Sequence, residues 1–199
     1  MLSCPSLSKS LFASGVLLLL VGCGAPTEEE LGSLESEVTS SEAALLPACP
    51  ASPELSEVVE HACVHAELGP FEPVTAATLG APVLVDVSTP HTAYNITLPP
   101  SSQSWGWAGR VSFLPDASGE FAFMLSRERG LRIYDAATGA EVARECRYSV
   151  PTDVCGALKT AIIADLEAGT EYHLEFHALL SCNASFSLLI EEAAHPHEG

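Results

Sequence analysis

The residues in this chain that are best suited to chemistry form a short cluster of imidazoles and one thiol, His61-Ala-Cys63-Val-His65. Imidazole nitrogen and thiolate sulfur are the ligands that zinc and copper prefer, and a tight site needs three or four of them. In a helix His61 and His65 share a face and Cys63 points elsewhere, whereas in an extended segment all three share a face. The cluster predicts a transition-metal site. A disulfide-bonded cysteine beside surface histidines is the alternative interpretation.

Other histidines can complete a metal shell around this cluster. His91 precedes an expected strand, and His195-Pro-His197 lies near the carboxy terminus. A closed shell of four ligands makes an ion structural or stored, and a shell of three leaves a position where water is activated. We expect zinc or copper as the ion. The favoured shell is Cys63, His65, His195 and His197, with His91 and His61 as substitutes.

A further pair, His173 and His177, flanks Glu175 in an expected strand. The three side chains fall on one face because successive side chains of a strand point to opposite sides. Such a face could hold a metal, but in an antiparallel strand it is usually only the polar, solvent-facing side.

The amino-terminal segment has the pattern of an export signal. Leu11 to Gly22 is an apolar stretch of twelve residues, short of the roughly 20 that a spanning helix needs. It ends in Leu20-Val21-Gly22-Cys23, which resembles the lipobox of bacterial lipoproteins. The resemblance implies a signal peptide over residues 1–22 and acylation of Cys23, for instance with palmitate. An ordinary cleaved signal or an uncleaved anchor helix is the alternative.

The segment after the leader is acidic. Residues 24–48 contain six acids and no base, and such a segment repels itself and orders poorly. We therefore expect residues 23–48 to be a flexible tether and residues 49–199 to be the domain. A short amphipathic helix around residues 31–46 is the alternative.

The overall charge excludes one class of partner. The 199 residues include 26 acids and 8 bases, for a net charge of −18. Nucleic-acid binding depends on clustered Lys and Arg, so we expect no nucleic-acid partner. The 47% hydrophobic content disfavours a disordered chain.

Five cysteines remain for the domain, which we place in an oxidising compartment. Cys146 and Cys155 flank a short loop between expected strands, so we predict that they form one disulfide. Cys49 would then pair with Cys182 and leave Cys63 unpaired. The alternative bridge, Cys49 to Cys63, leaves Cys182 free.

The elements that must position these residues are one helix and many strands. Ser52-Pro53-Glu54 is typical of a helix start, and Gly69-Pro70 ends the helical pattern. Period-two alternation then predicts an all-β domain, an antiparallel β-sandwich of the jelly-roll or Ig-like type with about eight strands and a short N-terminal helix. The expected strands are 83–87, 92–98, 108–114, 120–126, 131–135, 160–165, 171–179 and 184–191.

Several strand and turn motifs resemble those of the pre-peptidase C-terminal type of β-sandwich. They are Gly109-Arg-Val-Ser-Phe-Leu-Pro115, Gly119-Glu-Phe-Ala-Phe, Leu131-Arg-Ile-Tyr-Asp and Leu166-Glu-Ala-Gly-Thr-Glu-Tyr-His-Leu. The resemblance covers about residues 83–191. It implies an accessory module of exported bacterial proteins that helps secretion, folding or surface binding and has no catalytic residues.

Together these patterns predict a lipid-anchored, non-enzymatic binding or structural module. We expect it in the cell envelope, periplasmic or on the surface, held to a membrane by its lipid and carrying a zinc or copper site. The first alternative is a sandwich that binds protein or glycan through Trp105 and Trp107, with no metal. The second is a metal-dependent hydrolase.

Overall fold

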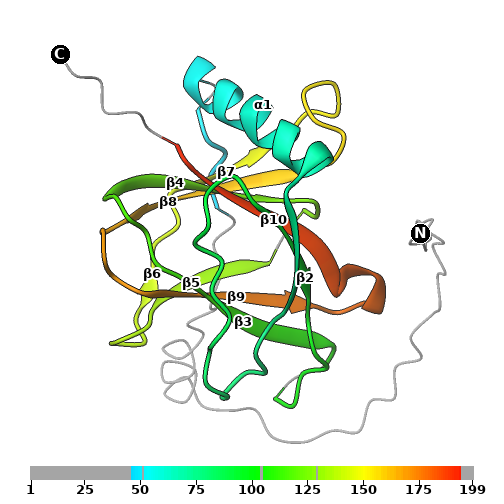
Figure 1. Cartoon of the computed structure of the whole chain (residues 1–199), viewed down its shortest axis with the longest axis vertical. Coiled ribbons are helices and arrows are strands. Elements are labelled where there is room, and N and C mark those ends of the chain that lie inside the picture. The colour runs from blue at the N-terminus through cyan, green and yellow to red at the C-terminus, as the bar shows by residue number, and fades with distance from the viewer. Residues whose placement is uncertain (1–45, 51, 104, 129, 194–199) are drawn as a thin grey trace, which may run out of the picture. The chain divides into compact units, whose positions relative to one another are not determined.

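Two stacked β-sheets and one helix make up the domain in the computed structural model, which describes residues 46–50, 52–103, 105–128 and 130–193. The six-stranded sheet has the order β1-β2-β10-β4-β8-β7, and the four-stranded sheet has the order β3-β9-β5-β6. Helix α1 (Pro53–Leu68) lies across the outer face of the six-stranded sheet (Figure 1). The strands are β1 (Phe71–Thr75), β2 (Ala93–Thr97), β3 (Trp107–Phe113), β4 (Gly119–Leu125), β5 (Leu131–Asp135), β6 (Glu141–Val142), β7 (Cys146–Ser149), β8 (Thr160–Leu166), β9 (Tyr172–Ala178) and β10 (Ser185–Glu192).

Helix α1 begins and ends where the sequence indicates. The Ser52 side chain accepts a hydrogen bond of 3.0 Å from the amide of Leu55, and Pro53 occupies the first turn, where its missing N–H has no cost. Gly69 follows at φ 82°, a conformation that a side chain disfavours, and its amide donates to the carbonyl of His65.

The central strands β4 and β8 of the six-stranded sheet are buried on both faces, which explains their continuous apolar runs. Along β4, Phe121, Phe123 and Leu125 face the four-stranded sheet, while Ala122 and Met124 face α1. The helix contributes four buried side chains to this second layer of core: Leu55, Val58, Val59 and Ala62. Because a strand alternates sides, a sheet covered on both faces needs apolar residues at every position.

The all-β prediction is confirmed at the level of two sheets and one helix, but the expected count of about eight strands is too low. The expectation of a purely antiparallel sandwich is wrong as well, because β1 pairs with β2 in parallel. The described residues form ten strands. Seven expected strands are present within two residues at each end. The expected strand 83–87 is not one, because the segment makes only an isolated bridge, Asp86 to Ser112. Residues 71–75, 141–142 and 146–149 are strands that the sequence pattern missed.

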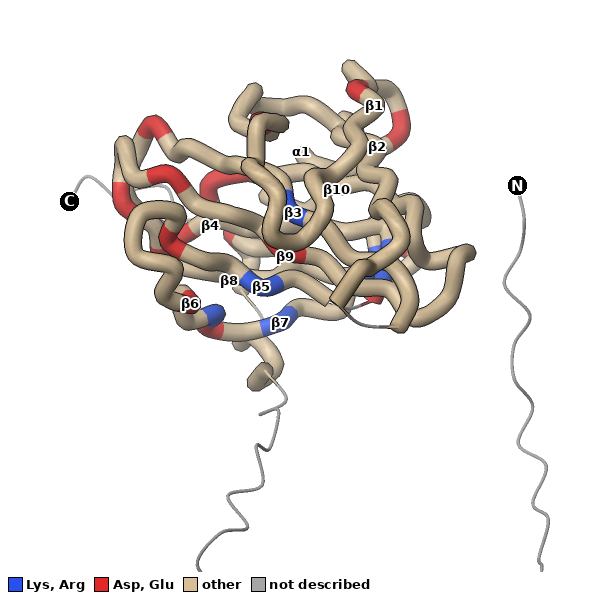
Figure 2. The backbone as a smooth tube through the Cα atoms, turned by 90° about the horizontal axis from the view of Figure 1, so that it is seen from below, with Lys and Arg blue, Asp and Glu red and all other residues tan. Residues whose placement is uncertain are grey.

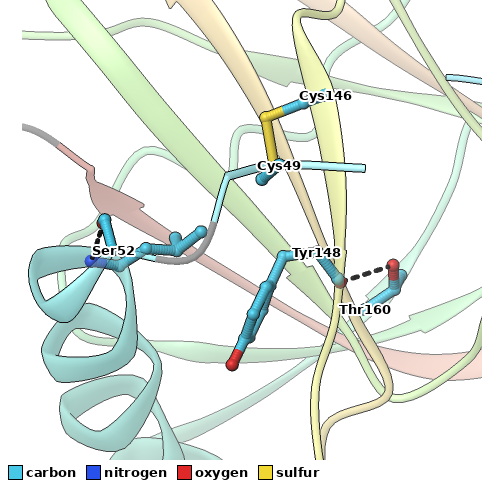
Figure 3. Close-up of a disulfide and its surroundings, with 6 residues drawn as sticks. Cys49, Ser52, Cys146, Tyr148 and Thr160 are labelled. Carbon is cyan, nitrogen blue, oxygen red and sulfur yellow. Dashed lines mark hydrogen bonds between the residues drawn. A yellow bond between two sulfur atoms is a disulfide. The ribbon is translucent and has the colours of Figure 1, made fainter. Parts of the chain in front are cut away.

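Two disulfides fasten the start of the domain to the six-stranded sheet, and both differ from the predicted pairs. Cys49 bridges to Cys146 on β7, and Cys63 on α1 bridges to Cys155 in the loop after β7. The predicted Cys146–Cys155 and Cys49–Cys182 pairs are wrong, as is the alternative Cys49–Cys63 pair. Figure 3 shows the Cys49–Cys146 bridge beside the start of α1.

The pairing follows from where the helix lies. Cys146 and Cys155 both belong to the layer of core between α1 and the six-stranded sheet, on the side from which Cys49 and Cys63 approach. Disulfides persist in oxidising environments, so the two bridges indicate an extracytoplasmic location. No helix among the described residues is long and apolar enough to cross a membrane. Cys23, the leader and residues 24–45 of the tether lie outside the described residues.

Candidate metal centre

Four side chains from three parts of the chain converge beside the second half of α1. They are His61 and His65 on α1, His91 just before β2, and Glu191 near the end of β10. One possible ligand atom from each lies within 4.8 Å of those from the other three. A zinc ion held at about 2.0–2.1 Å from nitrogen would require each of these atoms to move inward by less than about 1 Å. The arrangement is thus close to that of a metal shell.

The three imidazole rings form a nearly equilateral triangle. The ring centroids of His61 and His65 are 4.9 Å apart, those of His61 and His91 are 5.0 Å apart, and those of His65 and His91 are 5.1 Å apart. The helix produces the first pair because residues four apart share one face. The third ring comes from a residue at φ 55°, an unusual conformation for a non-glycine residue. That backbone places His91 opposite the helix.

The carboxylate of Glu191 lies beside two of these rings. It is only 9% exposed, and its two carboxylate oxygens lie 3.3 and 3.2 Å from Nδ1 of His91. Nδ1 of His61 lies 3.9 Å from Oε2 of Glu191. A buried carboxylate needs a hydrogen-bond donor or a cation, and the imidazoles are the partners that it has here.

A wide cleft of about 970 Å³ adjoins the cluster. Three of the four possible ligands, His61, His91 and Glu191, line it. Its lining includes apolar side chains from the core, such as Phe113 and Phe121. None of the described residues that line it is Lys or Arg. Its lining carries six carboxylates, those of Glu54, Glu57, Asp116, Glu120, Glu191 and Glu192. Figure 2 shows that acidic positions also outnumber basic ones along the rest of the described chain.

The structure revises the predicted ligand set. His61 and His91, expected only as substitutes, lie with His65 in the cluster. Cys63 is not available as a ligand, because its sulfur is bonded to Cys155. The group Cys63, Glu67 and Cys155 therefore offers no thiolate, although its atoms lie close together. His195 and His197 lie outside the described residues.

Sequence reasoning missed Glu191. It stands 100 residues from its partner His91, and the acidic pair Glu191-Glu192 at the end of a strand has no motif that separates it from a solvated strand end. The helical spacing of His61 and His65 was the one local signal of this cluster.

The second histidine pair does not form such a cluster. Glu175 lies opposite Arg110 on β3 and accepts hydrogen bonds from Arg110 Nε at 2.7 Å and from His177 Nε2 at 2.8 Å. Burial alone would raise the pKa of Glu175, but the hydrogen bonds from His177 and Arg110 outweigh it, so the pKa lies below its ordinary value. His173 is instead 4.0 Å from Glu171. The carboxylate of Glu175 thus already has hydrogen-bond partners in Arg110 and His177.

The two tryptophans differ in their environments. Trp105 is 95% exposed. Trp107 begins β3 and packs partly against the core between the sheets. Only Trp105 is therefore presented to a partner in the way that the sequence interpretation requires.

No protein-family model matches the chain, and no curated protein matches it either. The resemblances to lipoproteins and to pre-peptidase C-terminal sandwiches stay predictions.

Proposed function

We propose that this protein is an extracytoplasmic binding module that holds a transition-metal ion, zinc or copper, through His61, His65 and His91, with the carboxylate of Glu191 beside them. The observation that carries the proposal is the convergence of these four side chains within 4.8 Å. Imidazole suits both ions, and the adjacent carboxylate adds charge that favours a cation. The two cysteine bridges support an oxidising location.

The position of the cluster fits reversible binding better than a purely structural role. The side chains of His61 and His91 are 53% and 54% exposed, so an ion would be reached directly from solvent. The fold has two layers of apolar core, one between the two sheets and one between α1 and the six-stranded sheet. We therefore expect the fold to persist without metal, in contrast to small zinc domains that unfold when the ion is removed.

Metal titration of protein produced without an affinity tag tests the proposal. We expect one zinc or copper ion per chain, and binding that weakens in acid because only unprotonated imidazole is a ligand. His65→Ala should weaken binding at least tenfold. His173→Ala is the matched control, since it removes an imidazole outside the cluster, and it should leave the affinity unchanged. Absence of binding to the unmodified protein, or equal loss in both variants, would rule the site out.

We propose further that Cys23 anchors the module to a membrane and that the domain is a pre-peptidase C-terminal-type sandwich acting as an accessory module. The lipobox-like sequence before Cys23 supports the anchor, and the two-sheet architecture is compatible with such a sandwich. Labelling cells with a radioactive fatty acid tests the anchor. Label should appear in the unmodified protein and be absent from Cys23→Ser, and label that survives the substitution would contradict it.

A second candidate function is recognition of a glycan or protein through Trp105. The 95% exposure of this side chain favours it, since a bare indole offers a large apolar face for stacking. Trp105→Ala should then abolish binding to a glycan array while leaving metal affinity unchanged, and an array on which both proteins behave alike would argue against it.

A further inference from the structure

We propose that the three histidines hold the ion and that the ion keeps an exchangeable coordination position facing the cleft. This position and the cleft together bind a small organic molecule. The molecule has a carboxylate at one end, an ammonium group at the other and an apolar body between them. This inference rests on the proposed metal site. It adds a ligand class that the cluster alone does not define.

The hydrogen bonds around the rings show which nitrogens are free. Nδ1 of His65 lies 3.3 Å from the carbonyl oxygen of Gly69. That oxygen can only accept, so Nδ1 donates and Nε2 of the neutral ring keeps its lone pair. Nδ1 of His91 faces both oxygens of Glu191 at 3.2 and 3.3 Å. Its Nε2 is therefore the nitrogen left for an ion.

Glu191 then acts as a positioning residue behind His91. A carboxylate on the outer nitrogen of a metal-binding imidazole fixes the ring orientation and raises its basicity. Used in this way, Glu191 does not occupy the fourth position of a tetrahedral ion. Three protein ligands leave that position to water or to another donor.

On this proposal the fourth ligand enters from the cleft. His61 and His91 line it and His65 does not, so the triangle of rings has one side toward the cleft. Glu57 lines the cleft one helical turn before His61, which extends the same face of α1 along its wall. The volume of about 970 Å³ falls within the range of small-molecule sites, which is about 300–1,000 Å³.

The chemistry of the lining defines the ligand. The metal ion attracts a carboxylate. The lining, with Glu57, Asp116 and other acids and no described Lys or Arg, favours an ammonium group. The same lining includes Val58, Phe113 and Ile190, whose apolar atoms suit a hydrocarbon body.

Three probes of matched length separate these contributions by calorimetry on the zinc-loaded protein. They are 6-aminohexanoate, which carries both charged ends and is too long to chelate through them, hexanoate, which lacks the ammonium, and hexylamine, which lacks the carboxylate. We expect 6-aminohexanoate to bind about tenfold more tightly than either of the others, and about tenfold more tightly to the zinc-loaded than to the metal-free protein.

Variants locate the recognition of the ammonium. The double substitution Glu57→Gln and Asp116→Asn should remove the preference for 6-aminohexanoate over hexanoate and leave the binding of hexanoate unchanged. Glu72→Gln with Glu167→Gln is the control, because it removes the same net charge at exposed positions that do not line the cleft. Loss of the preference in the control as well would show a general effect of charge and overturn the inference.

The possible failures are distinguishable. A protein that binds zinc with high affinity but gives no heat with any probe has a closed shell, which overturns the inference and leaves the metal site intact. Equal binding of hexanoate and 6-aminohexanoate shows that the cleft does not recognise the ammonium, and that also overturns it. A protein that takes up no zinc in the preceding titration fails at the proposed function instead.

Discussion

Removing the Cys49–Cys146 and Cys63–Cys155 disulfides one at a time and together tests whether they act as a coupled pair. The bridges close overlapping segments of chain, with sequence separations of 97 and 92 residues. In an unfolded chain that keeps one bridge, the other closes a loop of only about 23 residues, 14 from Cys49 to Cys63 and nine from Cys146 to Cys155. The entropy that each bridge removes from the unfolded chain therefore depends on the other.

The loop-closure relation gives the expected sizes. A loop of about 23 residues corresponds to about 3.4 kcal/mol at 25 °C, and a loop of about 92 residues corresponds to about 4.7 kcal/mol. Each single removal should thus lower the free energy of unfolding by about 3.4 kcal/mol. Removal of both should lower it by about 8 kcal/mol, which exceeds the sum of the single effects by about 1 kcal/mol.

Guanidinium unfolding followed by circular dichroism measures these free energies. The variants are Cys49→Ala with Cys146→Ala, Cys63→Ala with Cys155→Ala, and all four changes together. The Cys63 pair should also reduce zinc affinity, because this bridge lies between His61 and His65 on α1 and holds the helix to the sheet. Single effects below about 1 kcal/mol, or a combined effect no larger than the sum, would refute the overlapping-loop reasoning.

Three further changes probe the helix, the partly buried ion pair of Glu175 with Arg110, and the core. Ser52→Ala removes the cap on the Leu55 amide and should cost about 1 kcal/mol in urea unfolding, while Ser52→Asp should cost far less; equal losses would contradict a capping role. Glu175→Gln should cost about 3 kcal/mol at neutral pH, because it leaves Arg110 without its carboxylate. The pKa of Glu175 is lowered in the folded protein, so the stability that Glu175 contributes is complete above its unfolded pKa of about 4.3 and is lost as the pH falls through its folded pKa. A stability difference between Glu175→Gln and the parent that persists in strong acid would oppose this assignment. Phe123→Ala, at a fully buried position, should lower the free energy of unfolding by about 3–5 kcal/mol. Leu84→Ala is the control, because Leu84 is 86% exposed, and it should cost less than about 0.5 kcal/mol. Similar losses at both positions would argue against the core described above.

Local patterns in the sequence predicted the elements well where one face of the chain is buried. In β9, Tyr172, Leu174 and Phe176 alternate with polar residues and do face the core. Prediction failed where the signal is weak or ambiguous. Val83 to Val87 has the composition of a strand but makes one bridge, and the two-residue strand Glu141–Val142 is too short to show any period.

The candidate metal site divides in the same way. The i,i+4 spacing of His61 and His65, together with the capped start at Ser52, was enough to place two imidazoles on one face of a helix. It also showed that Cys63 would point elsewhere in that helix. Neither fact identifies the third and fourth residues, because nothing local connects α1 with His91 or with Glu191.

The sequence by itself determined an acidic chain with one capped helix, many alternating strands and a pair of histidines on one helical face, since each of these depends on residues that are near one another in the chain. Only the tertiary structure decided that α1 covers the six-stranded sheet. That placement brings Cys63 to Cys155, Cys49 to Cys146, and the two helical histidines to His91 and Glu191. Disulfide partners and metal ligands are set by distances in space. Those distances follow from the packing of an apolar helix face on an apolar sheet face, and the spacing of residues in the sequence does not say which positions of the two faces meet.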